Sequence, residues 1–179
     1  RQFGESTLTA LSRLVRKNRR RYGGYVVHVG MVAIFVGITG TAFNSEREAT
    51  LNPGETVEVG NYTLRYQGVE TGRDANHEWA KARFEVFEGT RLTGVMVPAK
   101  NFYLASQQPT TEVAIRSSLR EDLYLALAAV SADGSVTFKV YVNPLVQWIW
   151  IGGLIFALGT VITMWPDASE RRQLIPRYV

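Results

Sequence analysis

The chain has 179 residues, 46% of them hydrophobic, and a net charge of +4, which is the composition of an ordinary soluble domain. Its apolar residues are nevertheless concentrated in segments 22–43 and 144–165, which together carry one ionisable side chain, that of His28. A hydrocarbon core about 30 Å thick requires about 20 mostly apolar residues in a helix. Both segments therefore predict transmembrane helices, and a purely soluble protein is excluded.

The positive charge lies at the two ends of the chain. Segment 1–21 has seven basic residues and one acidic residue, and segment 166–179 has three basic and two acidic residues, whereas segment 44–143 has 10 basic and 13 acidic residues. Short basic flanks of membrane spans stay on the cytoplasmic side. We therefore expect both ends in the cytoplasm and segment 44–143 at the outer face. No basic domain remains, so nucleic-acid binding is not expected.

The segment before the first span predicts a short amphipathic helix, because Leu8, Leu11 and Val15 recur at helical spacing among basic residues. Such a helix suits the anionic lipid surface of the cytoplasmic side, and a solvated linker is the alternative. The chain begins with Arg1 and not with methionine, so we expect it to be a fragment of a longer protein.

The first span is expected to pack against another helix through small residues. Five of them project from one face of the helix: Gly23, Gly30, Ala33, Gly37 and Gly40. Small residues let a second helix approach closely inside lipid. His28 projects from the opposite side, near Gly24, Phe35 and Thr39. We expect the second span to be one neighbour and a helix outside this chain to be another.

Segment 44–143 shows the pattern of a β domain. Apolar and polar residues alternate along 62–67 and 80–87, and further apolar runs lie at 94–97, 112–115, 123–130 and 136–142. Turn signals separate these runs, and Asp133-Gly134 is a good hairpin turn. Six to eight short strands with tight turns are typical of an antiparallel barrel or sandwich. Segment 100–111 lacks the alternation, and we expect a loop there.

The second span is expected to begin at Pro144, which is favourable in the first turn of a helix because its missing N–H is not needed there. Trp148 and Trp150 near one end and Trp165 at the other are typical of an aromatic belt. The expected fold class is therefore an α+β membrane protein, in which two transmembrane helices flank an antiparallel β barrel or sandwich at the outer face.

No catalytic motif is recognisable in the sequence. Glu121 and Asp122 are adjacent and point in different directions in a strand, so we expect both carboxylates to be solvated. His77 lies in segment 74–78, which is typical of an exposed turn before a strand and supplies too few ligands for a metal ion. The chain has no cysteine, which excludes disulfide bonds and thiolate metal sites.

His28 is the candidate site residue. An ionisable side chain inside a span is costly and usually faces protein or a cavity. His28 follows Tyr22 by six residues, which places it about 9 Å into the helix from the cytoplasmic end. Its imidazole can hydrogen-bond a neighbouring helix, relay protons, or ligate a metal or haem iron. The residues alone leave these three roles open.

Five blocks of the chain are distinctive, and they occur in this order: RRRYGGYVVHVG at 19–30, LNPGE at 51–55, TEVAIR at 111–116, EDLY at 121–124 and NPLVQWIWIGG at 143–153. Together they resemble the C-terminal region of the CcmF/CycK family of cytochrome c-type biogenesis proteins. The resemblance covers nearly the whole chain.

The resemblance implies a role in cytochrome c maturation in the bacterial inner membrane, with the central domain in the periplasm. The family is the large membrane subunit of a haem lyase, which helps to attach haem covalently to apocytochrome c, and it also holds haem b in the membrane. His28 matches one of the two histidines that ligate this haem b, and the other axial ligand comes from an upstream helix. His77 matches no functional histidine of the family.

The partners implied by the resemblance are a haem chaperone, other cytochrome c maturation proteins, apocytochrome c and membrane lipid. The fragment is not expected to catalyse haem attachment alone. A second interpretation requires no cofactor: a membrane-anchored β domain that scaffolds protein partners, with His28 as a packed hydrogen-bonding residue. A b-type haem spectrum of the full-length protein in detergent would distinguish the two interpretations.

Overall fold

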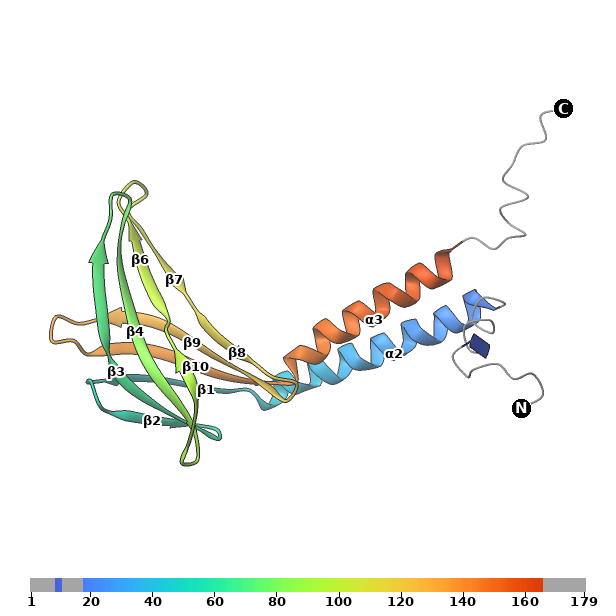
Figure 1. Cartoon of the computed structure of the whole chain (residues 1–179), viewed down its shortest axis with the longest axis horizontal. Helices are drawn as coiled ribbons and strands as arrows, with labels where there is room; N and C mark the ends of the chain where they lie inside the picture. Colours follow the sequence, from blue (N-terminus) through green and yellow to red (C-terminus); the bar gives the residue numbers. More distant parts are fainter. Residues whose placement is uncertain (1–8, 11–17, 166–179) are drawn as a thin grey trace. The chain divides into compact units, whose positions relative to one another are not determined.

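The computed structural model describes residues 9–10 and 18–165, which divide into two units (Figure 1). One unit is a pair of helices, formed by the described residues up to Val36 and from Trp148 onward. The other unit, Gly37–Gln147, is a β domain with the adjoining helix ends. The amphipathic helix expected around Leu11 and Val15 and the tail 166–179 lie outside the described residues.

The helices α2 (Arg19–Gly40) and α3 (Val146–Met164) are both long and apolar enough to cross a membrane. They are antiparallel, because Gly23 of α2 meets Gly159 of α3 whereas Gly30 meets Gly152. The five small residues expected on one face of α2 are all buried: Gly23, Gly30, Ala33, Gly37 and Gly40. The predicted packing face of the first span is therefore confirmed, with the second span as its neighbour.

The contact between α2 and α3 leaves no room for a side chain at Gly30 of α2 or at Gly152 of α3. A Cβ built on Gly30 would lie 2.5 Å from the backbone nitrogen of Phe156, and one built on Gly152 would lie 2.7 Å from the carbonyl oxygen of Gly30. Both distances are far below carbon–nitrogen and carbon–oxygen contact distances. The two backbones therefore approach as closely as they do only because both positions are glycine.

The described residues of the β domain form ten strands in two antiparallel sheets. The first sheet has the order β1-β10-β9-β8, formed by β1 (Ser45–Leu51), β10 (Val136–Pro144), β9 (Glu121–Val130) and β8 (Ala114–Ser117). The second sheet has the order β2-β3-β4-β6-β7, formed by β2 (Thr56–Val59), β3 (Tyr62–Arg73), β4 (His77–Glu88), β6 (Ala99–Tyr103) and β7 (Gln108–Glu112), and β5 (Arg91–Met96) pairs with β4.

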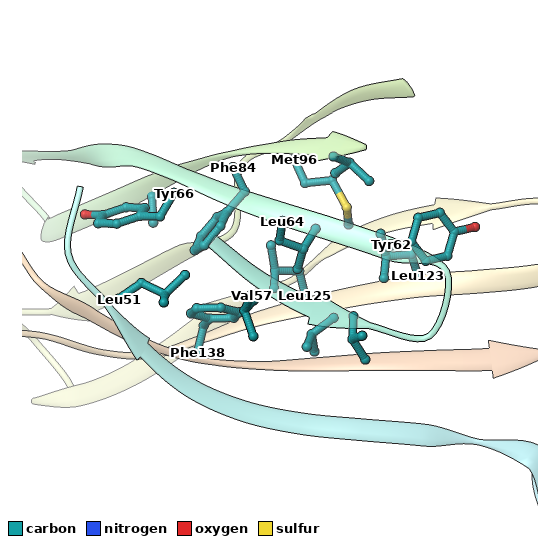
Figure 2. Packing of buried hydrophobic residues seen from close by; sticks show 14 of the residues in the cluster. Leu51, Val57, Tyr62, Leu64, Tyr66, Phe84, Met96, Leu123, Leu125 and Phe138 are labelled. Carbon is teal, nitrogen blue, oxygen red and sulfur yellow. The ribbon is translucent and has the colours of Figure 1, made fainter. Parts of the chain in front are cut away.

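The core of the β domain lies between the two sheets. Phe84 of β4 and Phe138 of β10 are fully buried, and their ring centroids are 4.7 Å apart (Figure 2). The Tyr66 ring lies 5.2 Å from that of Phe84, and its hydroxyl donates to the Gly134 carbonyl at 2.9 Å. Aromatic side chains from both sheets thus join them across the core. The expected fold, an antiparallel sandwich flanked by two apolar helices, is confirmed.

The β domain begins and ends in neighbouring strands. The 3₁₀ helix η1 (Thr41–Phe43) links α2 to β1, and β1 pairs with β10, which precedes α3. Pro144 is the last residue of β10 and not the first residue of the helix, because it continues the ladder opposite Glu121. Leu145 then turns the chain with a φ of 62°, and its N–H donates to the Arg120 carbonyl at 2.9 Å.

The described strands differ from expectation in number, ten in place of six to eight, and in two segments. Segment 100–111, expected as a loop, contains most of the β6–β7 hairpin. The alternation is missing because Asn101, which donates to the carboxylate of the exposed Glu112 at 2.7 Å, is a buried polar residue in β6, and because every residue of β7 is exposed. The run 112–115, expected as one strand, divides at Val113, where the chain passes from β7 in one sheet to β8 in the other.

We expect Gly30→Leu to lower the amount of assembled protein in the membrane and its thermal stability in detergent. The leucine side chain would have to displace the α3 backbone at Phe156, and forcing bulk into a packed contact costs about 1–3 kcal/mol. Gly153→Leu is the matched control, because a Cβ at Gly153 meets nothing within 4 Å. Equal accumulation of the two variants would show that this contact does not hold the helices together.

Candidate functional site

His28 lies on the side of α2 opposite the buried glycines. Its side chain is exposed, and Tyr25, Val32 and Phe35 on the same side are each more than half exposed. Residues spaced by three, four and seven positions share one face of a helix. The helix pair therefore presents an apolar and aromatic stripe with an imidazole at its centre, on a face that α3 does not cover.

The imidazole of His28 is held in one tautomer by the backbone. Its Nδ1 lies 2.7 Å from the carbonyl oxygen of Gly24, one turn earlier in α2. A carbonyl oxygen can only accept a hydrogen bond, so Nδ1 carries the proton and Nε2 has a free lone pair. A backbone carbonyl on the second ring nitrogen is the usual arrangement of metal-ligating histidines, since it fixes the ring and raises its basicity.

Arg21 and Tyr25 extend the stripe toward the start of α2. Arg21 Nε donates to the Tyr25 hydroxyl at 2.9 Å, and its guanidinium carbon lies 5.9 Å from the centre of the Tyr25 ring. This pair was not among the residues expected to form the site. The signal that could have found it is the spacing of Arg21, Tyr25 and His28, which places a cation, a phenol and an imidazole on one helix face.

The number of potential ligand side chains near His28 decides whether the site can hold a bare metal ion or a haem. In the part of the chain that the structure describes, no three His, Asp or Glu side chains gather as they would around a metal ion. His28 can thus supply one ligand only, which is too few for a bare ion. A haem iron needs only axial ligands from the protein. A single imidazole with a free Nε2 on an apolar helix face fits that requirement.

His77 has a different environment from His28. It is the first residue of β4 and is half-buried, whereas an exposed turn was expected, and its ring stacks on Tyr103 with centroids 5.2 Å apart. Its Nδ1 lies 3.0 Å from the Asp74 carboxylate, which also accepts the backbone N–H groups of Asn76 and His77. These two backbone hydrogen bonds are the main cause of the lowered pKa of Asp74. The arrangement stabilises the β3–β4 turn.

The carboxylates of Glu121 and Asp122 are not both solvated, so that expectation is wrong. Asp122 is only 7% exposed, and the amide of Gln147, in the first turn of α3, lies 3.3 Å from its Oδ2. Glu121 is half-buried beside Tyr62. Burial, and then the negative charge of Glu121, raise the pKa of Tyr62 to about 12. This polar group lies where β9 meets the start of α3, which strand alternation alone could not reveal.

Comparison with known proteins identifies relatives of the chain. The family described as "CcmF C-terminal beta-sandwich" matches residues 42–144. The cytochrome c-type biogenesis protein CcmF of Haemophilus influenzae is 33% identical over 152 residues, 84% of this chain and 24% of that protein. The cytochrome c-type biogenesis protein CycK of Rhizobium meliloti is 34% identical over 164 residues, 91% of this chain and 24% of that protein.

A solved structure shares the fold. The structure titled "Cytochrome c Heme Lyase CcmF" superposes with a TM-score of 0.71 over 84% of this chain and 26% of that chain, at 24% identity. At this identity the likeness establishes the arrangement of helices and strands. The chain spans about a quarter of the length of these relatives.

We expect the His28 ring to be protonated at Nδ1 in the protein without a bound metal, because the Gly24 carbonyl accepts that proton. Nitrogen-15 NMR of the labelled imidazole in detergent would measure the tautomer, with His28→Gln identifying the signal. A ring protonated at Nε2 instead would contradict the arrangement and would leave no lone pair pointing away from the helix.

Proposed function

This chain belongs to the CcmF C-terminal β-sandwich family, and from that membership we propose that it acts in cytochrome c maturation, as the C-terminal part of a haem lyase subunit. Its relatives from Haemophilus influenzae and Rhizobium meliloti are named cytochrome c-type biogenesis proteins. The observation that carries the proposal is the His28 imidazole, whose Nε2 is free on an exposed face of an apolar helix.

In this proposal Nε2 of His28 would ligate the iron of haem b. The Gly24 carbonyl holds the ring in the ligating tautomer. The exposed side chains of Val32 and Phe35 supply apolar contact for a flat macrocycle on the same helix face. A haem bound there would supply one-electron redox chemistry. The second axial ligand would come from a helix outside this chain, which would also cover the stripe.

A separate argument indicates that His28 has a partner outside this chain, because its uncovered imidazole edge would otherwise face lipid. A polar group left without a hydrogen-bond partner in an apolar medium costs several kcal/mol (about 2–7). Ionisable residues within spans therefore face protein, a cavity or a ligand. α3 does not cover His28, so we infer that a further element or cofactor of the complete protein does.

We further propose that the β domain lies in the periplasm and both ends of the chain in the cytoplasm, in the bacterial inner membrane. The charges of segments 1–21 and 166–179 support this orientation. Partners of the complete protein would be a haem chaperone, other maturation proteins and apocytochrome c. The covalent attachment of haem would require the complete subunit and its complex.

We expect His28→Ala in the full-length protein to lower haem content and cytochrome c production together. The variant removes one axial ligand but leaves a space of imidazole size, so added imidazole should partly restore the haem spectrum. His77→Ala is the control, because His77 lies in the β domain and should leave the spectrum unchanged. The measurement is the b-type absorption spectrum of the protein purified in detergent.

The cofactor-free scaffold predicts a different result for the same variant. If His28 only hydrogen-bonds another helix, its loss should cost about 0.6 kcal/mol, the average measured for such bonds in membranes. Assembly and maturation would then be nearly normal. Full haem content and full maturation activity in His28→Ala would reject the ligand role.

The orientation predicts that an alkaline phosphatase fusion within the β domain, for example in the β4–β5 turn after Glu88, is active in bacteria. A fusion after Val179 should be inactive, because the basic flanks retain both ends in the cytoplasm. The two activities would be normalised to protein amount. The reverse pattern would place the β domain in the cytoplasm and would reject the periplasmic role.

A further inference from the structure

A groove of about 690 Å³ lies between the two sheets of the β domain, beyond the packed core. One wall belongs to the larger sheet and includes Ala80 and Phe102, and the other is Ala128–Val130 of β9. Figure 1 shows β7 and β9 running in different directions from their ends beside β8, and residues of both strands line the groove. The groove is therefore a continuation of the sandwich interior that the domain's own side chains do not fill.

The backbone of β9 is left open along this groove. β8 pairs with β9 only from Asp122 to Leu125. Among the described strands, none pairs with the outer edge of β9 from Ala126 to Val130. A strand edge of this kind presents a row of N–H and C=O groups to which another extended chain can pair.

A lysine bridges the groove at one point of that edge. Ala128 is the extra residue of a bulge in the β9–β10 ladder, because Ala129 pairs with Thr137 and Leu127 pairs with Phe138. A bulge changes the direction of the local peptide groups. The ammonium group of Lys100 on β6 donates to the Ala128 carbonyl. The carbonyl is thus satisfied by a flexible side chain that can move away when another donor arrives.

The two edges that border the groove differ in their capacity to pair. β7 contains Pro109, which has no N–H, and proline is a usual means of protecting an edge strand. The free edge of β9 is formed by small and apolar residues without charge or proline, from Ala126 to Val130. Since neither proline nor charge blocks pairing at the edge of β9, an added strand is expected to pair with β9 and not with β7.

The charges around the groove select the chemistry of the occupant. Segment 44–143 has 10 basic and 13 acidic residues, so the domain is acidic overall. The groove lining nevertheless has two cations, Lys100 and Arg73, against one carboxylate, that of Glu78, which pairs with Arg73 at 3.2 Å, so one positive charge is in excess. Ala80 and Phe102 contribute apolar surface to the wall formed by the larger sheet. The site is therefore suited to apolar side chains accompanied by a carboxylate.

We propose that this groove binds an extended polypeptide segment of a partner protein, which pairs with the outer edge of β9 and carries apolar and acidic side chains. Its apolar residues would pack on Phe102 and Ala80, and its carboxylate would take the ammonium of Lys100, which releases the Ala128 carbonyl to the backbone of the added strand. The proposal uses only residues of the β domain and does not depend on the role of His28.

The test uses the complete 179-residue chain in detergent and a defined peptide, Glu-Val-Thr-Val-Trp-Val-Thr-Glu with blocked ends. The chain has no cysteine, so Ala129→Cys provides a single attachment site for a bimane label on β9. The peptide's tryptophan quenches bimane on contact. We expect saturable quenching at this position and none at Glu70→Cys, an exposed position outside the groove.

Two matched variants separate the groove from non-specific adhesion. Phe102 is 40% exposed and Tyr103 is 39% exposed, but Phe102 lines the groove whereas Tyr103 stacks on His77. We expect Phe102→Ala to weaken binding about tenfold or more, as for the loss of an aromatic anchor, and Tyr103→Ala to leave it unchanged. Replacing the peptide's central valine by proline should abolish binding, and lysine ends should weaken it.

Several results would overturn the proposal. They are the absence of saturable quenching up to millimolar peptide, equal quenching at Glu70→Cys, an equal effect of the Phe102→Ala and Tyr103→Ala variants, and undiminished binding of the proline peptide. The circular dichroism spectrum and melting temperature of each variant would show that it is folded, so that a loss of binding reports on the groove.

Discussion

The close approach of two helix backbones at glycines is the constraint on which the position of the site depends. Lipid chains are as apolar as leucine, so helices in a membrane associate through close packing and not through the hydrophobic effect. α2 and α3 achieve this packing where Gly30 meets Gly152 and Gly23 meets Gly159. Because that face of α2 is committed to α3, the opposite face, with His28 at its centre, is available to another partner.

The β domain is stabilised by its own core, without any cross-link. The chain has no cysteine, and the buried rings of Phe84 and Phe138 join the two sheets. The same sandwich is left open on the side of β7 and β9, where small residues such as Ala80 and Ala128 line a groove in place of a filled interior. A rigid core beside an unfilled edge is an arrangement in which binding an extended chain does not require the fold to change.

The parts of the fold that follow a regular period could be predicted from the sequence. The glycine spacing of α2 identified its packing face, alternation identified β3 and β4, and apolar runs identified β9 and β10. Two of the failures occurred where a polar residue takes an interior position, because the period-two pattern is interrupted there. Asn101 is buried against Glu112 in the β6–β7 hairpin, and Asp122 is buried beside Gln147. Such positions are decided by a specific partner distant in sequence, which no local pattern contains.

The two functional features of the chain differ in how complete they are. The apolar wall of the groove, its free strand edge and its cationic groups all lie within segment 71–130. Peptide binding to the groove can therefore be tested on this chain alone. In the proposed function His28 would supply one ligand and one helix face, and a haem with two axial ligands would require a second donor. The chain spans about a quarter of its relatives' length, and in the proposed function the exposed stripe on α2 would be covered by a helix outside this chain. The haem experiments therefore require the full-length protein, and a negative result with the isolated chain would not bear on the ligand role of His28.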